Sequence, residues 1–320
     1  EIEDAKVSGG EEGGEIAVEQ AYIKFNVSRN SYVTAGLFLP RIGLLNENHL
    51  PNTFNGNERT QVETYVIPST WRELGVGFYT HLDVLPIELS IAVLNGLNSS
   101  AFNHGTLIRE GRYEGRNASA NNLAFTGALQ YNKNNFSFQF SAYAGGTVGI
   151  SSLEADSLGL DSGPLGTPVI LAEADAQYKK NAFTFKVLAT SVSITDAKQI
   201  NDAFANNTPK NAYGFFAEAA YDFLYKNKKE KNHSLFCFVR FEKLNLNTSI
   251  PANGIDDPVL DQQHIIAGFA YLPIPNIAIK ADVRFSTSGD QNPLLIIPDP
   301  SAPPFKNENS FINLGIGFSF

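Results

Sequence analysis

The feature that most constrains the fold is a period-two alternation of apolar and polar side chains, which recurs along all 320 residues. Near the C-terminus, Ile312, Leu314, Ile316 and Phe318 alternate with small or polar residues. Successive side chains of a β-strand point to opposite faces, so such a segment has one apolar and one polar face. The pattern predicts an all-β chain.

The alternation marks about thirteen segments of the length expected for tilted membrane strands. These segments cover residues 15–28, 31–39, 72–82, 86–95, 122–132, 135–147, 168–179, 182–194, 213–225, 234–246, 262–272, 277–286 and 310–320. The connections between them alternate between short turns and long loops, and the long ones are 40–71, 96–121, 148–167, 195–212, 247–261 and 287–309. Tight turns on one rim and long loops on the other predict a single antiparallel transmembrane β-barrel domain over residues 1–320. The alternative is a soluble β-domain with its polar face outward.

Composition narrows the function classes. The chain has no run of about 18 apolar residues, which a membrane-spanning helix requires. A net charge of -9, from 33 acidic and 24 basic residues, argues against a nucleic-acid partner. Cys237 is the single cysteine, and the five histidines are scattered without metal-ligand spacing. We therefore expect no catalytic residue, no metal site, no cofactor and no enzymatic activity.

An odd number of strands cannot close an antiparallel barrel. The sequence therefore predicts at least one missing strand upstream of Glu1, which gives about fourteen strands, or three, which give about sixteen. Short turns lie in the periplasm in such barrels, so the C-terminus is expected there and residues 1–14 are expected to form an external loop. The terminal strand, with Phe318 and Phe320, resembles the signal that the outer-membrane insertion machinery recognises. We expect a Gram-negative outer membrane, with its lipid bilayer and lipopolysaccharide, as the surroundings.

Ionisable residues on the polar faces of these strands should line a wet lumen. The clearest of them are Lys24, Glu173, Asp175, Lys186, Glu218, Asp222, Arg240, Glu242, Lys280, Asp282 and Arg284. A phosphate pore needs several arginines or lysines converging on one path, whereas this set is mixed in sign and slightly acidic. The set predicts a general or weakly cation-preferring pore.

The stretch from Gly36 to Gly77 contains a combination of residues that is not expected of β-barrels in general. It resembles the signature region of the phosphate-selective porin O and P family through Pro40, Ile42, Gly43, Asn46, Glu47, Pro51, Thr53, Phe54, Glu58, Arg59, Val62, Glu63, Ile67, Pro68, Thr70, Trp71, Glu73, Gly75 and Gly77. The resemblance implies a porin fold, and by extension a homotrimer. Phosphate transport does not follow from it.

The 40–71 loop is long enough to fold into the lumen and narrow it. Its polar residues would then form the constriction, and the candidates are Asn46, Glu47, His49, Asn57, Glu58, Arg59 and Glu63. An equally weighted alternative is that Glu58, Arg59 and Glu63 form ion pairs that pin the loop to the wall. Both can hold together.

These observations favour passive diffusion of small hydrophilic solutes or ions. The rival hypothesis is a non-conducting structural barrel within a larger outer-membrane complex. The apolar, proline-rich residues 294–305 of the last long loop would serve as its contact surface, since exposed apolar patches often mark interfaces.

Overall fold

A computed structural model describes residues 2–4, 16–116, 118–227, 233–296, 301 and 303–319. The predicted N-terminal loop lies largely outside these residues, as do Phe320 and residues 297–300 and 302 of the proposed contact loop. Within the described residues, no helix is both long and apolar enough to cross a membrane.

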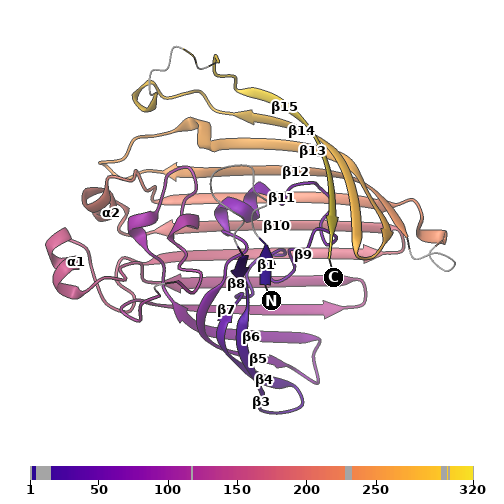
Figure 1. Ribbon diagram of the computed structural model, residues 1–320, viewed down its shortest axis with the longest axis horizontal. Helices are drawn as coiled ribbons and strands as arrows, with labels where there is room; N and C mark the ends of the chain where they lie inside the picture. Colours follow the sequence, from indigo (N-terminus) through magenta and orange to yellow (C-terminus); the bar gives the residue numbers. More distant parts are fainter. Residues whose placement is uncertain are drawn as a thin grey trace.

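Thirteen strands form one antiparallel sheet in which each strand pairs with its neighbours in sequence (Figure 1). The strands are β3 (Ala21–Asn26), β4 (Ser31–Phe38), β5 (Glu73–His81), β6 (Ile87–Asn95), β7 (Leu123–Lys133), β8 (Phe136–Gly145), β9 (Val169–Lys180), β10 (Phe183–Ile194), β11 (Asn211–Asp222), β12 (Ser234–Ser249), β13 (Asp261–Ile274), β14 (Ile277–Ser288) and β15 (Glu308–Phe318). The all-β prediction and the positions of these strands are confirmed, and short turns alternate with long connections.

The long connections carry the short helices. These are the π-helix η1 (Val62–Val66), the α-helices α1 (Ser152–Leu158) and α2 (Ala197–Phe204), and the 3₁₀ turns η2 (Ser99–Ala101), η3 (Arg109–Gly111), η5 (Pro258–Leu260) and η6 (Pro293–Leu295). The 3₁₀ turn η4 (Tyr225–Asn227) lies instead in the connection between β11 and β12. Most of this helical structure therefore gathers at one rim of the sheet.

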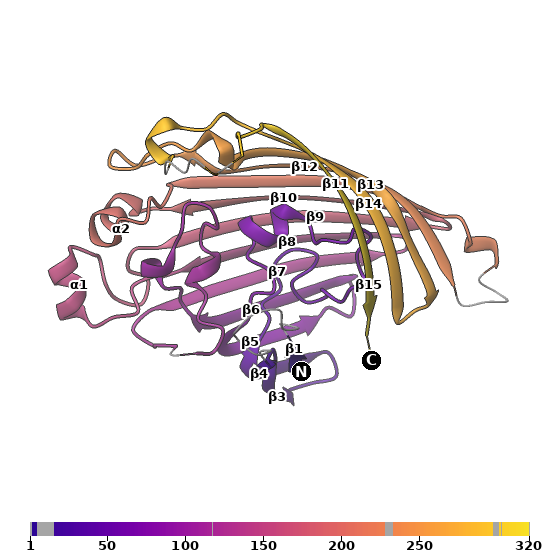
Figure 2. The same ribbon diagram turned by 45° about the horizontal axis from the view of Figure 1, so that its top comes forward.

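The sheet curls around a lumen, from β3 at one edge to β15 at the other (Figure 2). Its outer face is an apolar belt, to which most strands contribute an exposed residue such as Ile91, Phe125, Phe185 or Val239. Its inner face carries buried charged residues, described below. This distribution of apolar and polar faces is that of a barrel in lipid.

The prediction of one strand over residues 15–28 is wrong in one respect. The segment breaks after β2 (Ile16–Val18), which pairs with β1 (Ile2–Asp4) in a separate two-stranded sheet, and β3 begins only at Ala21. Glu19 lies at the break and is buried, hydrogen-bonded to a histidine of the 40–71 loop. A buried carboxylate needs such a partner, and this contact interrupts the alternation.

Strand β3 approaches β4 closely at Gly36, and this close approach requires a glycine there. Its φ is +135°, and a Cβ atom there would lie 2.4 Å from the carbonyl oxygen of Ala21. Residues other than glycine rarely adopt this conformation.

We expect Gly36→Val to destabilise the β3–β4 pairing, lowering the free energy of unfolding by about 1–3 kcal/mol. Ala35→Val is the matched control, because Ala35 is exposed on the opposite face of the same strand. Urea unfolding of the refolded protein in lipid vesicles measures the difference. Equal stability of the two variants would contradict this explanation.

Candidate functional site in the barrel lumen

The 40–71 loop leaves β4, returns at β5, and crosses the lumen to the opposite wall. There Lys280 of β14 donates from its Nζ to the carbonyl oxygens of Phe54 (2.7 Å) and Gly56 (2.8 Å). Asp282, also in β14, accepts from the backbone and side-chain nitrogens of Asn57 at 2.7 and 2.8 Å. Two of the predicted wall charges therefore bind the loop.

Strand β15 presents glycines where the loop passes. A Cβ atom at Gly315 would lie 2.4 Å from Oδ1 of Asn57, and one at Gly317 would lie 2.3 Å from Cβ of Pro51. The loop thus packs directly onto the backbone of the last strand. The small residues that alternate with isoleucine and phenylalanine near the C-terminus make room for it.

Arg240 of β12 is the centre of a buried charge cluster. It is 1% exposed, and its guanidinium lies 2.8 Å from Glu242 and 3.4 Å from Glu218. It also donates to the carbonyl oxygen of Glu58 at 3.3 Å, while Glu242 accepts from the backbone N–H of Gln61 at 2.6 Å. The cluster joins strands β11 and β12 to the loop.

The remaining cationic wall residues fall into two groups. Arg284 forms an ion pair with Glu58 at 2.6 Å, and Lys186 donates to the carbonyl oxygen of Thr53 at 3.4 Å, so both also hold the loop. Lys24 of β3 is exposed instead, with its Nζ 3.6 Å from the ring centroid of Tyr32.

Asp222 lies at the end of β11 and contacts backbone groups of the following connection. Its carboxylate accepts from the backbone N–H groups of Leu224 and Leu235, both at 3.1 Å, and the residue is buried. It stabilises the connection between β11 and β12. Neither of these contacts is to a group of the lumen.

Glu63 ties together the two ends of the 40–71 loop. Its carboxylate accepts from the backbone N–H groups of Leu44 and Leu45, both at 2.7 Å, and from the hydroxyl of Thr60 at 3.2 Å. Burial raises the pKa of Glu63 to about 7; the charge of Glu173 adds to this rise, and the backbone hydrogen bonds oppose it. The loop is therefore closed around a carboxyl group whose ionisation is disfavoured.

Glu173 and Asp175 of β9 lie beside this closure. Glu173 accepts from the backbone N–H of Gly43 at 3.3 Å and from the hydroxyl of Ser141 at 2.5 Å. Both carboxylates are buried. The lumen is therefore acidic beside β9. Along β10 to β15, by contrast, acidic and basic side chains form ion pairs.

Two of the predicted constriction residues are buried in structural contacts. The side-chain amide of Asn46 donates to the carbonyl oxygens of Pro40 (2.7 Å) and Trp71 (3.1 Å), and its Oδ1 accepts from the backbone N–H of Trp71. His49 lies 2.8 Å from Glu19; burial lowers the pKa of His49, but the hydrogen bond and charge of Glu19 outweigh it and raise the pKa overall. Both residues fix the shape of the loop.

Glu47 and Glu58 are the exposed members of the predicted constriction, and Asn57 and Arg59 are half-buried. The charge of Arg59 acts to lower the pKa of both Glu19 and His49, so Arg59 lies near this pair. The candidates thus divide into a buried set, Asn46, His49 and Glu63, and an accessible set.

Sequence reasoning missed the group around Arg41. Its guanidinium bonds Glu47 at 2.7 Å and Glu88 of β6 at 3.0 Å, and it lies over the ring of Tyr79. Tyr79 in turn stacks on Tyr32, with ring centroids 4.8 Å apart. Arg41 directly follows the loop's first proline, but the distance to Glu88 along the chain gave no signal of the ion pair.

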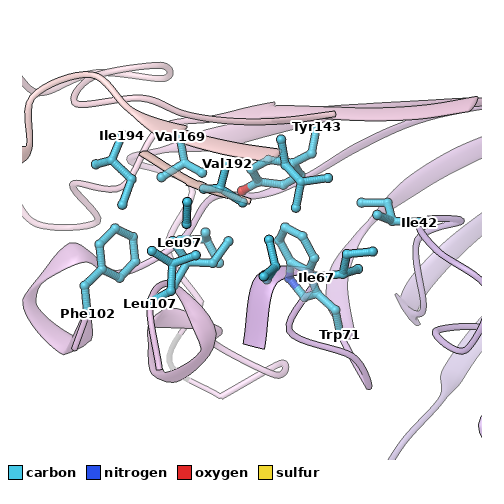
Figure 3. Packing of buried hydrophobic residues seen from close by; sticks show 14 of the residues in the cluster. Ile42, Ile67, Trp71, Leu97, Phe102, Leu107, Tyr143, Val169, Val192 and Ile194 are labelled. Atoms are coloured by element: carbon cyan, nitrogen blue, oxygen red, sulfur yellow. The ribbon is translucent and has the colours of Figure 1, made fainter. Parts of the chain in front are cut away.

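An apolar cluster, here called the mouth cluster, fills the lumen at the rim of the long loops (Figure 3). Wall residues near the strand ends, such as Tyr143, Val169 and Val192, pack against loop residues such as Ile67 and Trp71. The ring centroids of Trp71 and Tyr143 are 4.6 Å apart. Leu97, Phe102 and Leu107 of the next long loop extend the cluster. The loops and the wall thus share one packed apolar core at this rim.

The solved structures to which this chain is similar are outer-membrane proteins. Salmonella typhi OmpF, solved in a complex with daunomycin, superposes with a TM-score of 0.51 at 12% identity, over 87% of this chain and 73% of that one. The chain therefore has a porin fold. An anion-selective porin from Comamonas acidovorans has a TM-score of 0.48 at 10% identity, over 91% of this chain and 74% of that chain.

No family model matches the sequence. An uncharacterized protein of Aquifex aeolicus is 30% identical over a 295-residue alignment that covers 88% of this chain. The chain spans 64% of the length of that relative.

We predict that Arg240→Met lowers the free energy of unfolding by about 3–5 kcal/mol, because Glu218 and Glu242 would remain buried without their cation. Lys133→Met, at the exposed end of β7, is the control. Urea unfolding in lipid vesicles measures both. Adding Glu218→Gln and Glu242→Gln to Arg240→Met should recover part of the loss, and a triple variant no more stable than Arg240→Met would contradict the pairing.

We predict that Glu63 makes the docked loop less stable as pH rises. Its pKa of about 7 in the folded protein exceeds the ordinary 4.5, so its contribution is fully present below about pH 4.5 and is lost as pH rises to about 7. The loss is about 3 kcal/mol at most. Glu63→Gln should remove this part of the pH dependence in urea unfolding. An unchanged slope between these pH values would rule out Glu63 as its source.

Proposed function

We propose that the protein is an outer-membrane channel for the passive diffusion of small hydrophilic solutes or ions. The observation that carries this proposal is a porin-fold wall with an apolar outer face, crossed inside by the 40–71 loop. The path is a water-filled space beside the loop, and the accessible side chains Glu47, Glu58 and Arg59 border it. Residues 1–320 act as one barrel domain with the C-terminus in the periplasm, and the stretch from Gly36 to Gly77 resembles the phosphate-selective porins.

The balance of charge supports a general or weakly cation-preferring pore. The cations of strands β10, β12 and β14 are engaged with loop carbonyls or with Glu58, Glu218 and Glu242. An anion ladder would need such cations to face the solute. Glu47 and Glu58 leave carboxylate oxygens on the accessible side of the loop.

A second function is favoured by the mouth cluster. A rim closed by packed apolar side chains suits a non-conducting barrel that serves as a subunit of a larger outer-membrane complex. The apolar residues of the last long loop, among them the exposed Leu294, Ile296 and Phe305, would be its contact surface. A homotrimer is the other assembly that the sequence resemblance suggests.

We expect the purified full-length protein to give stable open steps in a planar bilayer, with a reversal potential in a salt gradient that is weakly cationic and unaffected by added phosphate. Glu47→Lys combined with Glu58→Lys should shift the reversal potential toward anions, because both carboxylates are accessible. Glu154→Lys, at an exposed position of α1, is the control and should leave it unchanged. Silence from folded, heat-modifiable protein would contradict the channel and direct attention to co-purifying proteins.

A further inference from the structure

Two neighbouring short turns of the sheet form a basic stretch of the rim. They connect β7 to β8 and β9 to β10, and they adjoin each other, because the backbone N–H of Lys179 donates to the carbonyl oxygen of Asn135 at 2.8 Å. Residues 131–138 and 176–186, which contain these turns and the adjoining strand ends, have four lysines and no acidic residue. This part of the rim is therefore positively charged.

The protein itself does not neutralise these charges. Lys133, Lys179 and Lys180 are exposed, and no carboxylate among the described residues forms an ion pair with them. The acidic side chains of the preceding turn and strand, Asp83 and Glu88, bond an asparagine and an arginine instead. The lysines are free to bind an anion from outside the chain.

A pocket of about 390 Å³ lies at the two turns, and we call it the turn pocket. Its lining combines Lys133 and Lys179 with the amide residues Asn132, Asn135 and Gln177, and it includes no acidic residue. Ammonium and amide N–H groups are the donors that phosphate oxygens accept from. The lining therefore suits a phosphate group.

Aromatic side chains place the turn pocket at the edge of the lipid-facing belt. Lys133 is the cross-strand partner of Phe136, and Lys180 is the partner of Phe183, so each lysine shares a sheet face with an exposed phenylalanine. Aromatic girdles mark the level at which hydrocarbon gives way to head groups. Lysines beside such a girdle extend their ammonium groups toward lipid phosphates.

The opposite rim has the reverse charge. The connection between β8 and β9, which contains α1 and lies at the left in Figure 1, has no basic residue between positions 146 and 168. Its acidic residues Glu154, Asp156 and Asp161 are all exposed. An anionic head group is attracted to the lysines of the short turns and repelled from this connection.

We propose that the turn pocket binds the phosphate group of an anionic phospholipid through Lys133 and Lys179. This site presupposes the membrane location of the proposed function. A lipid is favoured over a free anion because its head group is held at the level of the aromatic girdle, directly beside the lysines.

Native mass spectrometry of the full-length protein in detergent micelles measures the binding of added lipids. We expect phosphatidylglycerol to bind more tightly than phosphatidylcholine, whose head group has no net charge. Lys133→Gln combined with Lys179→Gln should weaken phosphatidylglycerol binding at least about fivefold, since one lysine near an anionic lipid surface ordinarily contributes about that factor. Phosphatidylcholine binding should not change. Heat-modifiability on a gel verifies that the double variant is folded.

Lys226→Gln is the matched control, because Lys226 is exposed in the β11–β12 connection at the same rim but does not line the turn pocket. It should leave phosphatidylglycerol binding unchanged. An equal loss in this control would mean a general attraction of anionic lipids to the rim. Equal affinity of the unmodified protein for the two lipids would mean that the head group is not recognised. Either result overturns the proposal.

Inorganic phosphate distinguishes a lipid from a free anion as the ligand. Compared with sodium chloride at the same ionic strength, it should not displace phosphatidylglycerol. Displacement by phosphate alone would assign the pocket to a free anion and overturn the lipid.

Lipid binding does not depend on conductance. A silent barrel whose phosphatidylglycerol binding requires Lys133 and Lys179 would refute the channel and keep the site. A conducting barrel without that requirement would do the reverse.

Discussion

The interior of this barrel depends on the contacts between the 40–71 loop and strands β10 to β15. Backbone groups and polar or charged side chains of the loop contact wall residues that are mostly shielded from water, namely Lys186, Arg240, Lys280, Asp282 and Arg284. Removing one member would leave its partner buried without compensation, which costs far more than the loss of a surface ion pair. These contacts hold the loop against the wall along its whole middle section, and the mouth cluster packs above it.

The strands could be predicted from sequence because their signal is local. An apolar residue at every second position, bounded by turn residues, fixes both the strand and its inward face, as in Ile277 to Phe285 of β14. The exception is informative: within residues 15–28 the apolar positions change phase between Val18 and Ala21, and Glu19 leaves the sheet there to pair with His49. The prediction of one continuous strand overlooked this change of phase.

The site could be predicted only in part, because its contacts are not local. The sequence predicted charged residues on the inner face, but it could not pair Asn57 with Asp282, or Glu63 with the backbone of Leu44 and Leu45. The role of Gly315 was equally hidden, since a glycine facing the lumen and a glycine facing a packed loop read the same in a sequence. Long-range partners require the fold.

The pairing of charges bears on selectivity more than their number does. Lys280 donates to two loop carbonyls, so its charge attracts a passing anion only weakly. Arg240 lies between Glu218 and Glu242, so its charge attracts an anion even less. The field in any water beside the loop therefore comes from a few accessible groups such as Glu47 and Glu58. Water must also pass the mouth cluster, whose side chains are mostly apolar. The channel and the structural barrel thus differ at one place: whether the loops around Trp71 and Phe102 separate.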